Sequence, residues 1–313
     1  MAWNEPVHMD PHPISTRSLS MAEVPCSACT WTPTRQSRCS YESHVSIFYS
    51  AGNRAAWSLG SKYILKERST EPPNFESVNL QFLSSKTTIP IPEQLEEWEE
   101  DGRYFQIMKR MRGKPLEQAW PTMSQEEKER VASQTAEYLK QLRGLHSDRT
   151  EGLGGQPIYG GFLFGSDYRK GHGPLSSDDE LWAEMSESIA HVPEEVRVKL
   201  RERLPTGAPY TFTHGDLTDV NIMVEDGNLV GIIDWEGAGH FPVWWEFAAL
   251  SIGLGQVDCE WKPMLRKFLP TEDRDFWMLF YSLQRYPQLD ETARKFFDEA
   301  GLELPAVEAS STE

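Results

Sequence analysis

The side chains best suited to chemistry lie between His214 and Asp234. An H-G-D triplet ends at Asp216, and Asn221 follows after four residues. Beyond Asn221, the turn E-D-G-N separates two apolar runs that are typical of a β-hairpin, and Asp234 ends the second run. Because a hairpin brings its entry and its exit together, we expect Asn221 to lie near Asp234, one loop away from Asp216.

Two carboxylates and a carboxamide that converge beside a hairpin suit Mg²⁺, a hard cation that prefers oxygen ligands. In phosphoryl transfer, one aspartate can orient the attacking hydroxyl while an Asp/Asn pair holds the metal on the phosphates. Each residue also has an ordinary alternative, because a single loop aspartate usually forms a turn and an asparagine before a strand is often a cap. The whole combination favours a catalytic site.

The motifs H-G-D-x4-N and I-I-D-W-E resemble those of the aminoglycoside phosphotransferase and choline kinase-like enzymes, which share the protein-kinase-like fold. The resemblance covers residues 41 to about 290, and the T-T-I-P-I-P segment is similar to fungal members. It implies an α+β, bilobal protein-kinase-like fold, with a small mixed β-sheet N-lobe and a mainly helical C-lobe. It also implies transfer of the γ-phosphoryl group of ATP to a hydroxyl of a small molecule, with Mg²⁺ as the metal.

The resemblance assigns roles to five residues. Asp216 would be the catalytic base, and Asn221 and Asp234 would be the metal ligands. Lys66, in Y-I-L-K-E, would bind the α- and β-phosphates, and Glu76 in the next helix would hold it in place. A lysine between apolar strand neighbours needs a partner, which favours this role over that of a surface lysine on an edge strand.

The same resemblance places the nucleotide base beside residues 107–111. Met108 would be the gatekeeper, and the backbones of Lys109 and Met111 would hydrogen-bond the adenine edge. Gly52 is the best candidate for a phosphate loop, although its turn lacks the G-x-G-x-x-G of protein kinases.

Three further features of the catalytic segment bear on mechanism and acceptor. His214 is expected to brace the loop through hydrogen bonds. Glu246 has two open readings, as an anchor of the catalytic loop or as a charge that stabilises a helix N-terminus. Gly215 stands where protein kinases carry arginine, and no A-P-E follows Asp234. The missing activation segment favours a small-molecule acceptor over a protein.

The elements that must position these residues begin with three short strands, predicted at 45–49, 55–59 and 63–66. A helix is predicted over 75–83 and a strand over 104–108, with the acidic residues 93–101 as a solvated loop between them. We assign residues 1–40 to an arm without apolar periodicity, 41–108 to the N-lobe and 109–313 to the C-lobe. Cys26, Cys29 and Cys39 in the arm, with His44, make a weak zinc pattern.

The C-lobe is predicted to be helical. A capping box at Ser124 and Glu127 begins a helix of about 20 residues, and another starts at Ser177 and Glu180. The second of these helices is predicted over 178–190, and further helices at 193–204, 243–252 and 272–285. Residues 151–176 contain eight glycines without G-K-[S/T], so we expect a flexible loop and not a P-loop.

Composition limits the classes of partner. The 313 residues carry 31 basic and 48 acidic side chains, a net charge of −17, which disfavours a nucleic-acid binder. No segment approaches the roughly 20 apolar residues of a membrane span, and no secretory signal begins the chain. Four cysteines give no disulfide framework, so a cytoplasmic location is expected. The oligomeric state is not predicted.

The acceptor is expected between the 151–176 loop, the 178–190 helix and the segment after Asp234. Aromatic and acidic side chains there would suit a cationic or amine-bearing alcohol: Tyr159, Trp182, Trp235, Trp244 and Trp245, with Asp178, Asp179, Glu180, Glu236 and Asp258. The alternative is that the tryptophans fill the core and the acids reflect overall composition. Two other functions remain open, a silent pseudokinase that binds nucleotide and a protein kinase.

Overall fold

The computed structural model describes residues 44–165, 167–272 and 274–305. The predicted N-terminal arm and its three cysteines lie outside these ranges, so the zinc pattern stays a prediction. Within the described ranges, no helix combines the length and the apolar character needed to cross a membrane.

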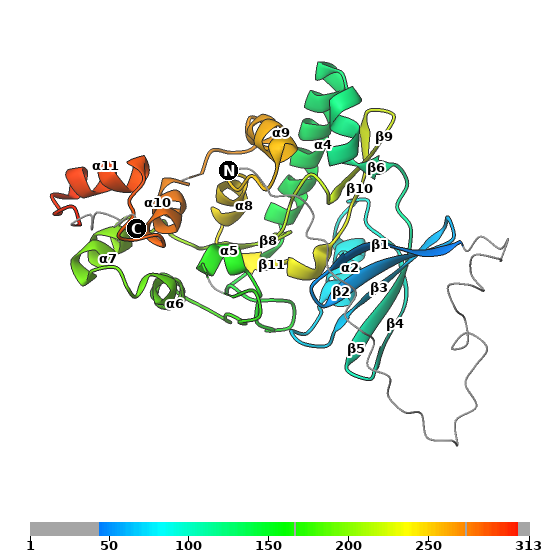
Figure 1. Cartoon of the computed structure of the whole chain (residues 1–313), viewed down its shortest axis with the longest axis horizontal. Coiled ribbons are helices and arrows are strands. Elements are labelled where there is room, and N and C mark those ends of the chain that lie inside the picture. The colour runs from blue at the N-terminus through cyan, green and yellow to red at the C-terminus, as the bar shows by residue number, and fades with distance from the viewer. Residues whose placement is uncertain (1–43, 166, 273, 306–313) are drawn as a thin grey trace, which may run out of the picture. The chain divides into compact units, whose positions relative to one another are not determined.

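A five-stranded sheet carries Lys66, Met108 and Lys109 of the predicted nucleotide-binding residues (Figure 1). Its order is β1-β2-β3-β5-β4. Every pair of neighbours is antiparallel, so the expectation of a mixed sheet was wrong. Short connections explain the β1–β2, β2–β3 and β4–β5 pairs, because hairpin turns can join only antiparallel neighbours. Strands β3 and β5 are instead separated by residues 70–102. The strands are β1 (Val45–Ala51), β2 (Arg54–Leu59), β3 (Tyr63–Ser69), β4 (Gln94–Glu100) and β5 (Arg103–Lys109).

Strand β4 corrects the prediction of an acidic loop at 93–101. Its glutamates are exposed, as charges on an edge strand usually are. Trp98 stacks on Phe105 of β5, with ring centroids 5.0 Å apart. This cross-strand aromatic pair stabilises a strand whose sequence carries mainly charge.

Helix α2 (Glu76–Lys86) links the sheet to the helical lobe. Its first residue is Glu76, the predicted partner of Lys66. The Glu76 backbone N–H donates to Asn74 Oδ1 at 2.7 Å. Leu80 and Leu83 are buried in a core that also contains residues from the C-terminal lobe. The two lobes therefore share apolar packing around α2.

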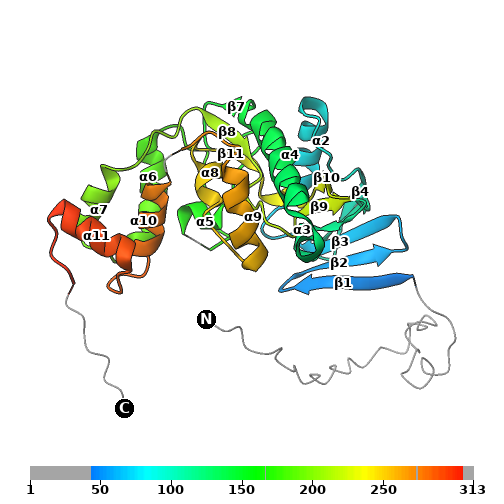
Figure 2. The same cartoon turned by 90° about the horizontal axis from the view of Figure 1, so that it is seen from above.

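The helical lobe is built around α4 (Gln125–Arg143), which begins with the predicted Ser124–Glu127 capping box. The Ser177 side chain also caps a helix, but Glu180 reaches back to the Ser176 N–H instead of completing a box. Figure 2 shows α7, α10 and α11 grouped at the end of the lobe away from the sheet. The helices beyond α4 are α5 (Gly161–Phe164), α6 (Asp178–Ser186), α7 (Glu194–Arg201), α8 (Trp245–Ala249), α9 (Gln256–Arg266), α10 (Asp275–Leu283) and α11 (Glu291–Ala300).

Four of these helices match the predicted positions, whereas α9 and α11 were not predicted. The loop at 151–176 contains α5 and isolated β-bridges, including one between Ile158 and His172, so it is more ordered than expected.

Two small antiparallel sheets hold the catalytic segment. The predicted hairpin is present as β9 (Ile222–Glu225) and β10 (Asn228–Ile232), joined to β6 (Lys114–Pro115). Strand β8 (Tyr210–Thr213), which leads into the H-G-D triplet, lies between β7 (His146–Ser147) and β11 (Gly239–Phe241).

The segment between β5 and β6 passes close to β9 at Gly113. A Cβ at this position would lie 2.3 Å from the Val224 carbonyl oxygen, and φ is 77°. Both features require glycine.

We predict that Gly113→Ala lowers the free energy of unfolding by about 2–4 kcal/mol, because the methyl group adds a clash to a left-handed backbone. Gly102→Ala is the matched control, with φ 73° and no described atom within 4 Å of a Cβ. It should cost only about 1 kcal/mol. Urea denaturation followed by circular dichroism measures both, and equal losses would contradict the proposed close approach.

Candidate active site

Lys66 is the centre of the predicted site. It lies in β3 between Ala56 of β2 and Gln106 of β5. Its Nζ contacts Glu76 at 2.8 and 2.7 Å and Asp234 Oδ1 at 2.7 Å. Burial lowers the pKa of Lys66, but the two carboxylates more than offset this and the net shift is upward. The lysine is therefore held in its charged form.

The Lys66–Asp234 contact also sets the charge of the aspartate. Burial raises the pKa of Asp234, whereas the ammonium of Lys66 lowers it by more, so the net shift is downward. The backbone of Asp234 is left-handed, with φ 67° and ψ 60°. A non-glycine residue in this conformation is uncommon and often belongs to a functional site.

Helix α2 is bonded directly to the turn that follows Asp234. This turn, η4 (Trp235–Gly237), donates the Trp235 N–H to Glu76 Oε1 at 3.2 Å. One helical turn further along α2, Asn79 donates to the carbonyls of Trp235 and Ala238 at 2.8 and 3.2 Å. The position of Glu76 beside Lys66 is thus fixed by backbone contacts and not by the ion pair alone.

His214 braces the catalytic loop, as expected. It is fully buried, its Nδ1 accepts from the Asp216 N–H at 3.3 Å, and its Nε2 lies 2.9 Å from the Ile233 carbonyl. Burial lowers the pKa of His214 to about 4. A neutral ring protonated on Nε2 satisfies both contacts, so His214 ties the loop to the strand end that carries Asp234.

The backbone at Gly215 leaves no room for a side chain such as the arginine of protein kinases. Its φ is 85°, and a Cβ would lie 2.2 Å from the Gly237 carbonyl oxygen. The catalytic loop and the η4 turn are therefore in backbone contact, which only glycine permits here.

Asn221 is bonded to the backbone of Asp216, through its Nδ2 at 2.9 Å from the Asp216 carbonyl. The Ile233 N–H in turn donates to the Asn221 carbonyl at 3.0 Å. These bonds connect Asp216, Asn221 and the residue before Asp234. Within the described residues, no group of three or more His, Cys, Asp or Glu side chains could hold a metal ion. The metal-ligand assignment of Asn221 and Asp234 therefore stays a prediction.

The Asp216 side chain is exposed to solvent on one side, with protein on its other sides. This surrounding protein, followed by the negative charge of Asp234, raises the pKa of Asp216 to about 6. Contact with water screens part of the repulsion.

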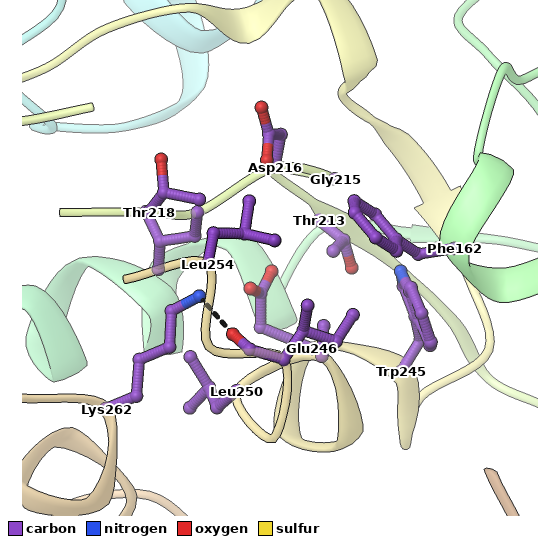
Figure 3. A pocket seen from close by; sticks show the side chains of 13 residues that line it. Phe162, Thr213, Gly215, Asp216, Thr218, Trp245, Glu246, Leu250, Leu254 and Lys262 are labelled. Carbon is purple, nitrogen blue, oxygen red and sulfur yellow. Dashed lines mark hydrogen bonds between the residues drawn. The ribbon is translucent and has the colours of Figure 1, made fainter. Parts of the chain in front are cut away.

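A pocket of about 370 Å³, including its open part, adjoins Asp216 (Figure 3). Leu250, Leu254 and Trp245 contribute apolar walls, and Glu246 and Lys262 are its ionisable groups besides Asp216. Lys262 is itself occupied, at 2.7 Å from the Ile252 carbonyl and 3.1 Å from Asp258.

Of the two readings of Glu246, the structure supports its role as an anchor of the catalytic loop. It lies in α8, and its Oε2 accepts the His214 backbone N–H at 3.3 Å. Burial raises the pKa of Glu246 to about 7, against smaller opposing effects from the His214 N–H and Lys262.

The structure limits which backbone groups of the predicted adenine site are still free to bind the base. Met108 is buried at the end of β5, and the Lys109 N–H already donates to the Glu93 carbonyl at 2.8 Å. Only the carbonyl of Lys109 is left for an adenine contact. The Met111 side chain packs over Gly231 of β10, and Gly52 lies at the open tip of the β1–β2 hairpin.

The residues of the predicted aromatic and acidic acceptor neighbourhood do not all face one site, because Trp245 is the one predicted aromatic residue that lines the pocket beside Asp216. Trp235, Trp244 and Trp245 are at most 1 % exposed, because large aromatic rings fill the core. Each of the five acids already has a partner in the chain: Asp178 with the Gly207 N–H, Asp179 with Arg201, Glu180 with the Ser176 N–H, Glu236 with Arg54 and Arg68, and Asp258 with Lys262 and the Asp219 N–H.

Sequence reasoning missed two cations at the site. Arg54 and Arg68 both bind Glu236. Only Arg68 had a detectable signal in the sequence, since it lies two residues after Lys66 and therefore on the same face of β3.

We predict that Glu246→Gln becomes more stable than the wild type as pH rises. The folded protein holds the Glu246 proton more tightly than an unfolded chain, where the pKa is about 4.5. This contribution to stability is complete below pH 4.5 and is lost as pH rises through 7. Glutamine keeps an acceptor for His214 without the charge.

The gain should reach about 1–3 kcal/mol at pH 8 and vanish near pH 4.5, as measured by urea denaturation across that range. A pH-independent difference would contradict the assigned environment of Glu246. Glu195→Gln, on the exposed side of α7, is the control and should show no such trend.

Comparisons with known proteins agree with this geometry. A model of the phosphotransferase enzyme family matches residues 55–274, well over half of the chain. A search of the curated proteins gives no significant match.

Several solved structures have a similar fold. Aminoglycoside phosphotransferase APH(2'')-Ib with ADP bound is 16 % identical, with a TM-score of 0.51 over 85 % of this chain and 94 % of that one. The streptomycin–ATP complex of APH(2'')-IIa is 17 % identical, with a TM-score of 0.52 over 89 % and 97 %. APH(4)-Ia with ADP and hygromycin B is 17 % identical, with a TM-score of 0.51 over 82 % and 89 %.

At these identities the structural matches concern the fold, and they confirm the α+β architecture of a sheet-containing N-lobe and a helical C-lobe. The family match carries the assignment. The chain belongs to the phosphotransferase enzyme family.

Proposed function

We propose that this protein transfers the γ-phosphoryl group of ATP to a hydroxyl of a small molecule. The observation that carries the proposal is the connected set of contacts from Lys66 through Asp234 to the loop of Asp216. Phosphoryl transfer depends mainly on positioning and on charge neutralisation, and this set provides both.

Asp216 is proposed as the group that orients the acceptor hydroxyl and takes its proton. A pKa near 6 keeps the carboxylate largely ionised at neutral pH while it remains a usable base. Its backbone is held on both sides, by His214 and by Asn221. These contacts favour a fixed orientation of Asp216, in contrast to a free aspartate on the surface.

Asn221 and Asp234 would hold Mg²⁺. The donor set fits the metal, because Asp234 is ionised and the Asn221 nitrogen is already bonded, which leaves the amide oxygen as the ligand atom. When bound, Mg²⁺ neutralises charge on the phosphates. Lys66, supported by Glu76, would bind the phosphates directly, with the Gly52 turn above them and the carbonyl of Lys109 and the backbone of Met111 beside the base.

A small-molecule acceptor is favoured by the short connection after Asp234. Only η4 and β11 separate Asp234 from α8, and β11 pairs with β8, so the connection is part of a sheet. A protein kinase needs a longer segment there to hold a peptide. The acceptor pocket is proposed beside Asp216, and the hypothesis of a cationic acceptor now rests on Glu246 in that pocket.

We predict that Asp216→Asn and Asp234→Asn each lower kcat for Mg²⁺-dependent phosphate transfer by at least about 100-fold. Both substitutions keep the side-chain shape, so circular dichroism should show an intact fold. Asp226→Asn, in the turn of the same hairpin, is the control and should stay within about twofold, because its left-handed backbone also suits asparagine.

The assay follows ATP consumption with a library of alcohols, amino alcohols and sugars, beside a protein substrate and a thermal-shift measurement with Mg²⁺–ADP. Nucleotide binding without turnover on any acceptor would support the pseudokinase alternative. Transfer to the protein alone would support a protein kinase.

A further inference from the structure

Three cations share one face of the sheet above the catalytic turn. Arg54 of β2 is the direct cross-strand partner of Arg68 of β3, and Lys66 precedes Arg68 by two residues. Side chains two residues apart on a strand point to the same face. Like charges directly opposite each other destabilise a sheet unless an anion lies between them.

Glu236 supplies that anion. It lies in η4, two residues beyond Asp234, and its two carboxylate oxygens contact different guanidinium groups. Oε1 meets Arg54 Nη1 and Oε2 meets Arg68 Nη1. One carboxylate therefore connects the ends of two N-lobe strands to the turn that carries Asp234.

The two arginines are not equivalent. The Arg68 side chain is 8 % exposed, and its Nη2 also donates to the Pro72 carbonyl at 3.2 Å. The Arg54 side chain is 30 % exposed and lies just after the Gly52 turn, at the start of β2. Arg68 is thus fixed by a backbone contact, whereas Arg54 can change partner at a lower cost.

Arg54 is also within electrostatic reach of the proposed phosphate site. Besides Glu236, the carboxylate of Asp234 acts on its charge. Asp234 itself lies 2.7 Å from Lys66 Nζ. A phosphate beside Lys66 would therefore be a second anion for the Arg54 guanidinium, whose fork suits phosphate oxygens.

We propose that Arg54 is a second phosphate-binding cation beside Lys66, and that Glu236 positions it and competes with the phosphates for it. This inference rests on the proposed nucleotide site. On nucleotide binding, Arg54 exchanges the Glu236 carboxylate for a phosphate oxygen, while Arg68 keeps Glu236. Through this exchange, the start of β2 loses its contact with η4 and gains a contact with the nucleotide.

The test compares binding of ADP and of adenosine by isothermal titration calorimetry, in EDTA so that only direct phosphate contacts are measured. Arg54→Met should weaken ADP binding about tenfold and leave adenosine within twofold, because adenosine has no phosphate. Glu236→Gln should tighten ADP binding at least threefold by removing the competitor. The double variant should behave like Arg54→Met.

Arg103→Met is the matched control. Arg103 lies on the same sheet, is 33 % exposed and pairs with Glu67 at 2.9 Å, so it loses a comparable ion pair away from the site. It should leave both affinities unchanged. Thermal unfolding checks each variant, and Arg54→Lys, which keeps the charge without the fork, replaces Arg54→Met if that variant does not fold.

The outcomes distinguish a failure of the proposed role of Arg54 from a failure of the proposed function. If Arg54→Met and Glu236→Gln shift ADP affinity in the same direction, or shift adenosine as much as ADP, the ion pair is only structural and the inference is overturned. The same holds if the wild type binds ADP and Arg54→Met does not weaken it. A wild type that binds neither ligand overturns the proposed function itself.

Discussion

One partly buried cation, Lys66, determines how the catalytic elements meet. It contacts Glu76 from α2, ten residues along the chain, and Asp234 from the end of the β9–β10 hairpin, 168 residues away, so three elements converge on a single ammonium group. Charges removed from water need partners, and the loss of any one would leave the others uncompensated. The backbone bonds from α2 to η4 then convert this electrostatic requirement into a defined geometry.

The catalytic loop is held by close backbone contacts more than by ion pairs. Gly215 lies against Gly237, neutral His214 bonds to Ile233, and Glu246 accepts the His214 N–H from below. Such a framework costs little reorganisation during reaction, which is what phosphoryl transfer requires of a protein. It also explains why a buried histidine that does not titrate near neutral pH belongs in the motif.

The sequence allowed prediction where chemistry depends on local spacing. The hairpin between Asn221 and Asp234, the capped helix at Ser124 and the Lys66–Glu76 pair all followed from motif or resemblance. Helix α9 was missed because Pro263 lies inside it, whereas the capping residues Asp290 and Gly301 were signals for α11 that could have been used. The Arg54–Glu236 contact joins residues 182 positions apart, and no local pattern reports such a pairing. Composition could not tell which tryptophans of the acceptor neighbourhood only fill the core and which, like Trp245, also line the pocket beside Asp216.

The charge balance of the cleft bears on how so acidic a chain could accept a polyanion. Arg54, Lys66 and Arg68 are matched one for one by Glu76, Asp234 and Glu236, so the site has no surplus of positive charge, and Asp216 adds a negative one. Phosphates entering it must either displace a carboxylate from its cation or bring a cation with them. The first route is open only where a partner is exposed enough to move, and the second suits oxygen ligands such as the proposed pair Asn221 and Asp234. A site in which every cation is already paired therefore favours the proposed nucleotide over free inorganic anions. Only a ligand whose base also contacts residues 107–111 gains enough binding free energy to offset the exchange.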